Sequence, residues 1–164
     1  MAFSSPLSRI RQHHALEHAT ITLLSQRIPG VQLVARSDFQ GFIVVGNLDT
    51  AALAAASEEA LARLQGGEER LAVHPNCGTN LVTAGLLSGM AAFVATSGRS
   101  RSLADRLPSA VLAATVALLA AAPAGRWAQQ NVTTTPHVED ARIACVRKLE
   151  GGPVMRHRVY ISHD

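Results

Sequence analysis

In the first half of the chain the spacing of apolar residues changes several times, from that of a helix to the alternation of a strand and back. The run from Pro6 to Arg27 has helical spacing, with Ser5 as N-cap and Pro29-Gly30 as the stop. Two β-like runs around a polar, Gly-containing turn predict a hairpin. The expected elements here are a helix over 6–27, strands over 31–36 and 42–45, a helix over 51–65 capped by Asp49 or Thr50, and a short strand over 71–74.

Two long stretches in the middle of the chain, over 79–98 and 107–125, contain no charged residue. Each is close to the roughly 20 residues that cross a bilayer. A polar, Arg-rich turn over 99–106 separates them. Gly85 and Gly89 have the small-residue spacing that lets membrane helices approach closely, and Trp127 follows where an interfacial aromatic is favoured. We expect a hairpin in the lipid bilayer; the alternative is a soluble, Ala-rich hairpin buried in a homo-oligomer.

The last part of the chain is polar again. Thr135 and Pro136 have the form of a helix start, and Val138, Arg142, Cys145, Val146 and Leu149 mark one face of a helix. Gly151-Gly152-Pro153 ends it. A final strand over 154–162 follows, with Val154, Val159 and Ile161 facing inward and with His157 and His163 exposed.

This order of elements predicts an α+β fold with an inserted two-helix transmembrane hairpin. The expected domains are 1–76, the N-terminal half of the α+β domain; 77–127, the hairpin; and 128–164, which completes the α+β domain. Both halves then lie on one side of the membrane. The absence of a signal peptide favours the cytoplasm, whereas the arginines of the turn favour the turn itself being cytoplasmic. We give the missing signal more weight.

Composition excludes few classes of function. The formal net charge is +3, and the arginines do not form a run beside aromatics, which argues against nucleic-acid binding. The two cysteines, Cys77 and Cys145, lie far apart and indicate a reducing compartment rather than a disulfide framework.

The chemistry of the chain is concentrated in His13-His14-Ala15-Leu16-Glu17-His18. In a helix, His14, Glu17 and His18 share a stripe with apolar residues, namely Ile10, Ile21, Leu24 and Ile28. Burial of these polar groups without partners costs several kcal/mol, about 2–7 for each neutral group. A metal ion would satisfy all three side chains, and so would a cluster in which they bond to one another.

A zinc site needs a third protein ligand from elsewhere in the fold. His74 is the first candidate, because it ends the expected short strand and leads into a turn. Glu139 is the alternative third ligand, although acidic residues at a helix start also suit the helix dipole. Cys77 follows in the same turn as His74, where packing is the commoner role of a lone cysteine.

The order His-x-x-Glu-His resembles the inverzincin metallopeptidase motif. The resemblance covers five residues and implies that His14 and His18 bind Zn²⁺ while Glu17 is the general base. More broadly, the His-rich helix, His74-Pro-Asn-Cys-Gly-Thr-Asn80 and the two hydrophobic stretches are similar to an uncharacterised bacterial family of small membrane proteins of unknown function. That likeness spans about 13–134 and implies no activity.

Three functions fit these patterns. The first is a membrane-bound zinc hydrolase acting on a peptide or lipid-derived substrate. The second is a non-catalytic metal- or haem-binding membrane module. The third is a structural or assembly factor of a membrane complex, with His14, Glu17 and His18 as a buried hydrogen-bonded cluster.

Overall fold

The computed structural model describes residues 5–97, 102–152 and 154–163. The chain forms two compact units: Met1–His74 with Gln130–Asp164, and Pro75–Gln129. We call the first the α+β unit and the second the helical pair. The polar turn over 99–106 lies partly outside the described residues, as does Pro153 of the expected helix stop.

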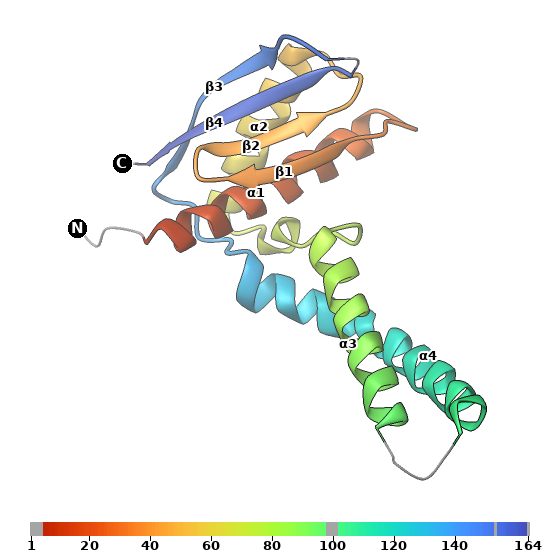
Figure 1. Cartoon of the computed structure of the whole chain (residues 1–164). Coiled ribbons are helices and arrows are strands. Elements are labelled where there is room, and N and C mark those ends of the chain that lie inside the picture. The colour runs from red at the N-terminus through yellow and green to blue at the C-terminus, as the bar shows by residue number, and fades with distance from the viewer. Residues whose placement is uncertain (1–4, 98–101, 153, 164) are drawn as a thin grey trace. The chain divides into compact units, whose positions relative to one another are not determined.

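The sheet of the α+β unit joins the two ends of the chain (Figure 1). Its strands are β1 (Val34–Asp38), β2 (Gly41–Val45), β3 (Ala141–Leu149) and β4 (Arg156–His163). They pair antiparallel in the order β1-β2-β4-β3. The expected hairpin near the N-terminus is therefore confirmed, with its first strand starting three residues later than predicted. Together with the helices this makes a mixed α+β fold.

Two helices pack on one face of this sheet (Figure 1). They are α1 (Pro6–Arg27) and α2 (Thr50–Gln65), and both N-caps are as predicted: Ser5 accepts from the Ser8 amide and Asp49 from the Ala52 amide. The core between helices and sheet is contiguous. Its largest fully buried apolar side chains are Phe42, Leu16, Leu23, Leu24, Leu53, Val44, Val138 and Val159.

The predicted apolar stripe of α1 is wrong in its position. The buried residues of α1 centre instead on Leu16, Ala19 and Leu23, while Ile28 is 37% exposed. The helix is covered on more than one side, so its buried surface is wider than a single stripe. His14 and His18 therefore lie beside the hydrophobic core rather than within it.

The expected short strand over 71–74 is also wrong. Glu69–Ala72 forms a 3-10 turn, η1, in which the Leu71 amide donates to the Glu68 carbonyl. Leu71 and Ala72 are both buried. Adjacent residues of a strand point to opposite faces, whereas a tight turn can bury both against one neighbour, here α1.

The late helix expected from Thr135 is β3 instead. Its register shifts by one residue between Ile143 and Cys145, which is a β-bulge. Because of the bulge, Ile143 and Val146 both pack toward the core although they are three residues apart. A bulged strand thus has the spacing of one helical turn, and this misled the prediction.

The final strand is confirmed, but the expected exposure of its histidines is wrong. His157 is fully buried and the His163 side chain is only 5% exposed. His157 lies on the same face as Val159 and Ile161, as strand alternation requires. Val154, expected to face inward, is exposed.

The helical pair consists of α3 (Gly78–Thr96) and α4 (Leu103–Ala128), and η2 (Gln129–Thr133) continues α4. Both helices are long and apolar enough to cross a membrane. Gly85 and Gly89 do not form the contact between α3 and α4, since a Cβ at either position would meet nothing within 4 Å. The close approach is at Gly125, where a Cβ would lie 2.4 Å from the Asn80 side-chain oxygen.

Candidate metal centre

His14 and His18 lie one turn apart on α1 with their rings together. The ring centroids are 4.3 Å apart and the planes are tilted by 59°. His18 is buried and His14 is half-buried. Their spacing follows directly from the helix, since residues four apart share a face.

Each of these rings is oriented by a backbone carbonyl through its Nδ1 atom. The His14 Nδ1 lies 3.0 Å from the Thr133 oxygen, and the His18 Nδ1 lies 2.8 Å from the Ala72 oxygen. A carbonyl can only accept, so Nδ1 carries the hydrogen in both rings. In the neutral ring the lone pair is then on Nε2. Histidine ligands of metals commonly have this arrangement, with the second ring nitrogen donating to a carbonyl or carboxylate.

His74 joins the pair from the segment after η1. Its ring centroid lies 5.8 Å from that of His18, and the side chain is half-buried. Three imidazoles that share a tetrahedral zinc through Nε2, at about 2.0–2.1 Å each, have centroids roughly 5 Å apart. The observed separations of 4.3 and 5.8 Å bracket that value. The pairs His14–His18 and His18–His74 are thus each at a spacing that two histidine ligands of one zinc ion can have.

Glu17 lies between His14 and His18 in the order of the motif and is 8% exposed. The Ser37 hydroxyl of β1 donates to its Oε2. The carboxylate is thus oriented by the sheet side of α1.

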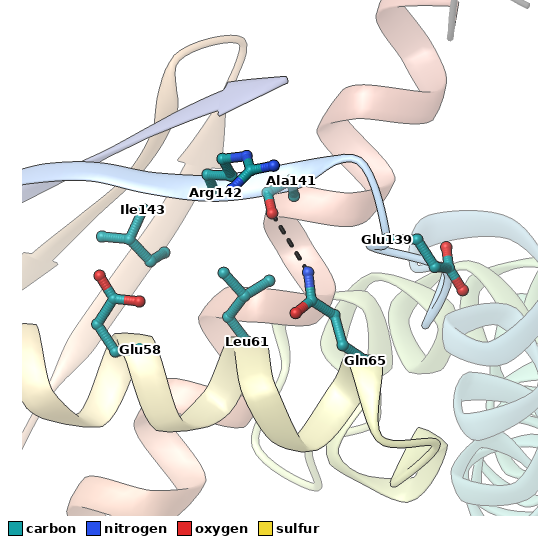
Figure 2. Close-up of a pocket in the computed structure, with 7 residues that line it drawn as sticks. All are labelled: Glu58, Leu61, Gln65, Glu139, Ala141, Arg142 and Ile143. Atoms are coloured by element: carbon teal, nitrogen blue, oxygen red, sulfur yellow. Dashed lines mark hydrogen bonds between the residues drawn. The ribbon is translucent and has the colours of Figure 1, made fainter. Parts of the chain in front are cut away.

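Glu139 has different surroundings from the histidines. It is exposed and, with Glu58, Gln65 and Arg142, lines a pocket of about 540 Å³ between α2 and β3 (Figure 2). The Gln65 amide donates to the Ala141 carbonyl in the wall of this pocket. In this structure Glu139 is thus part of a surface pocket, whereas the His74 ring lies beside that of His18.

A second histidine contact was not expected from the sequence. The His13 Nδ1 donates to the Asp38 carbonyl at 2.7 Å, and its Nε2 lies 2.9 Å from the Nε2 of His163. Asp140 lies 3.4 Å from the other nitrogen of His163. Burial lowers the pKa of His13. His13 therefore accepts from His163, and the two ends of the chain meet through neighbouring imidazoles.

Comparison with known proteins places the chain in a family. Residues 9–146 match the family described as "Domain of unknown function (DUF6391)". The chain belongs to this family. The DUF6391 match covers His14, Glu17, His18 and His74, and so includes the whole candidate centre.

A curated relative of this DUF6391 protein is an uncharacterized protein of Picosynechococcus sp. (strain ATCC 27264 / PCC 7002 / PR-6). It is 38% identical over 139 residues, which cover 76% of this chain and 65% of the relative. The chain thus spans about two thirds of the relative's length. No solved structure matches the chain. The expected similarity to an uncharacterised family is confirmed, and membership assigns no activity.

Proposed function

We propose that this DUF6391 protein is a membrane-bound zinc-dependent hydrolase with its metal held by His14, His18 and His74. The observation that carries the proposal is the orientation of both helix imidazoles by backbone carbonyls, which leaves Nε2 as the ligating atom. A catalytic zinc site commonly uses three protein ligands and an open position. In the proposal, His14, His18 and His74 supply that number.

When bound, zinc supplies Lewis acidity that polarises a carbonyl and activates water. In the proposal, Glu17 is the general base and takes up a proton on its carboxylate. The Ser37 hydroxyl holds that carboxylate in one orientation. The substrate class that fits this chemistry is a peptide or a lipid-derived amide or ester reached at the bilayer.

Membrane insertion of the helical pair is part of the same proposal. No residue of α3 is buried, and its large apolar side chains are exposed in the described chain. The exposed side chains are Leu81, Val82, Leu86, Met90, Phe93 and Val94. Soluble proteins rarely leave so large a contiguous apolar patch in water, and a bilayer covers it without cost. Insertion also brings the α+β unit to the bilayer surface; which side it occupies remains a prediction from the sequence.

The metal is tested on the full chain purified in detergent without chelators. We expect about one zinc ion per chain by elemental analysis. His14→Ala, His18→Ala and His74→Ala should each lower that content strongly. His137→Ala is the matched control, because His137 is exposed on a loop and should leave the zinc content unchanged. Metal-free wild type would overturn the proposal in favour of a hydrogen-bonded cluster.

Hydrolysis is tested with Glu17→Gln. This variant should keep the zinc of the wild type and lose turnover of fluorogenic peptides and esters by about 10²–10⁴-fold. A second candidate is a non-catalytic metal-binding module, because the Ser37 hydroxyl already occupies one carboxylate oxygen of Glu17. Retained zinc with no hydrolysis by wild type across these substrates would support that second candidate.

Insertion is tested by washing membranes with alkaline carbonate. We expect the chain to stay in the pellet and to need detergent for release. Recovery of a folded, soluble monomer without detergent would contradict insertion, whatever the outcome of the metal analysis.

A further inference from the structure

The sheet has a second face that α1 and α2 do not cover (Figure 1). The residues that alternate with the buried ones point to this open face, among them Arg36, Ile43, Arg158 and Arg147. The strand register places these four in one row across the sheet, because Arg36 pairs with Ile43, Ile43 with Arg158, and Arg158 with Arg147. Arginines from three of the four strands thus share one row, in which Arg147 and Arg158 are neighbours and Ile43 separates them from Arg36.

Arg156 adds a further guanidinium one row away, since it pairs with Val45 and Leu149. Arg36, Arg147 and Arg156 are all exposed. Among the residues of the four strands, Asp38 is the single carboxylate. The open face therefore carries an excess of positive charge.

Asp38 is already engaged by one of these arginines. Arg158 makes two hydrogen bonds to its carboxylate, at 3.0 and 2.7 Å. Burial alone would raise the pKa of Asp38, but the Arg158 guanidinium and the Gln40 amide hold it below its usual value. The Asp38 charge is thus used within the sheet. Among the described residues no carboxylate pairs with Arg36, Arg147 or Arg156, although Arg156 donates to the Gly151 carbonyl, so their charges remain for a ligand.

The neighbouring arginines on the open face destabilise the sheet when no ligand is bound. Like charges directly opposite one another on neighbouring strands are destabilising, and Arg147 is directly opposite Arg158. Tyr160 offsets part of this cost, because both guanidinium carbons lie over its ring, at 5.9 and 5.6 Å from the centroid. A bound anion would remove the remaining repulsion. Such a departure from ordinary pairing often marks a binding surface.

We propose that this open face binds the anionic headgroups of phospholipids. The charge is spread over a flat sheet rather than gathered in a cleft, which suits a charged surface better than one small anion. Phe39, in the turn between β1 and β2, is 67% exposed and supplies an aromatic of the kind found at lipid interfaces.

Lipid is favoured over nucleic acid as the ligand of the open face, because the α+β unit is linked to the helical pair at two points of the chain. This part of the inference rests on the proposed insertion of the helical pair, which joins the α+β unit at both His74 and Gln130. A tether at two points keeps the unit at a high effective concentration of headgroups. Each arginine close to an anionic membrane then contributes to attraction, and three do so together.

The experiment uses the full chain in dodecyl maltoside micelles at constant detergent concentration. Phosphatidylglycerol is titrated in, with phosphatidylcholine as the uncharged control, and the thermal midpoint is followed. Binding to the folded state raises the midpoint. We expect a rise with phosphatidylglycerol alone, lost in high salt because exposed charges are screened.

A variant in which Arg36, Arg147 and Arg156 are all replaced by Gln shows whether the open face is the binding site. It should need at least about ten-fold more phosphatidylglycerol for a half-maximal shift. The matched control replaces Arg27, Arg63 and Arg70 with Gln, removing the same charge from the helix side, and should titrate like wild type. Hydrogen exchange should slow in β3 and β4 when phosphatidylglycerol is present.

Three outcomes would overturn the inference. One is an equal response to both lipids, and another is an unchanged titration of the sheet variant. The third is salt-sensitive binding of a single-stranded RNA oligonucleotide to wild type that is lost in the sheet variant while the lipid titration is unchanged. Carbonate extraction tests insertion separately, because the sheet variant keeps both apolar helices; a failed insertion is thereby distinguished from a failed headgroup site.

Discussion

His157 is a buried imidazole at the contact between β4 and the start of α2. Its Nε2 lies 3.0 Å from the Thr50 hydroxyl, and its Nδ1 has no hydrogen-bond partner among the described residues. Burial lowers the pKa of His157, and the nearby charge of Lys148 lowers it further. The ring is therefore held neutral in the folded protein.

This gives a prediction for stability against pH. The unfolded ring takes up a proton near its ordinary pKa of about 6.5, while the folded ring stays neutral to a lower pH. Below about pH 6.5 the unfolded state therefore binds more protons, and stability falls as pH falls. His157→Gln should flatten this acid slope in thermal unfolding between pH 7.5 and 5. The exposed His137→Gln is the control, and an equal slope in wild type and His157→Gln would contradict the assignment.

Residue placement was only partly predictable. The period-two pattern of the last strand already grouped His157 with Val159 and Ile161, so its burial carried a signal that the polar character of histidine obscured. The contact between His13 and His163 carried no such signal, because the two residues are 150 positions apart. The pair His14 and His18 was predictable from helix spacing alone. The position of His74 beside them depended on η1, whose form was predicted wrongly.

Among the elements, β2 depends most on a single backbone position. Gly41 begins the strand with φ +139°, and a Cβ there would lie 2.1 Å from the Val159 carbonyl oxygen of β4. The same residue is the partner of Asp38 at the tip of the β1–β2 hairpin. One glycine thus allows both the turn and the close pairing of the two central strands.

Gly41→Ala should destabilise the α+β unit by roughly 3 kcal/mol, because strain in φ and a backbone clash act together. Gly67→Ala is the matched control: its φ is +90°, but nothing lies within 4 Å of an added Cβ, so only the backbone strain of about 1 kcal/mol is expected. Chemical denaturation of the two variants measures the difference. Equal losses would show that the clash at Val159 is absent.

The elements also show where reasoning from sequence reaches its limit. Both capped helices were predicted nearly to the residue, because Ser5 and Asp49 give local signals at the helix starts. β3 was not, since a bulge is set by pairing with β4 and leaves only a misleading spacing in the sequence. Helix starts, which depend on nearby residues, could thus be predicted from the sequence. The bulge could not, because it depends on a strand distant in the sequence.

At the scale of the whole molecule, the segments that precede and follow the helical pair in the sequence both bond to α1. His18 bonds to the Ala72 carbonyl and His14 to the Thr133 carbonyl. These two histidines are one turn apart, about 6 Å along α1. The two points at which the chain leaves and rejoins the unit therefore lie against neighbouring positions of the same helix.

Replacement of Pro75–Gln129 by a flexible ten-residue Gly/Ser linker should give a soluble, folded α+β unit. Such a linker has an average span of about 17 Å, which is enough to join the two points. Circular dichroism and gel filtration should show a folded monomer, and elemental analysis should show retained zinc if His14, His18 and His74 are sufficient ligands. An aggregated product would mean that the helical pair is required for folding, and a folded, zinc-free product would mean that it supplies a ligand.

The pairing of β2 with β4 has a consequence for biosynthesis. Val44 pairs with His157, so the centre of the sheet cannot form until the ribosome has made more than a hundred further residues. At about 5–20 residues per second this takes roughly 6–23 seconds. Both apolar helices emerge during that interval, while the N-terminal half still lacks its central partner strand. If the helical pair enters the bilayer as proposed, it can do so before the centre of the sheet has formed.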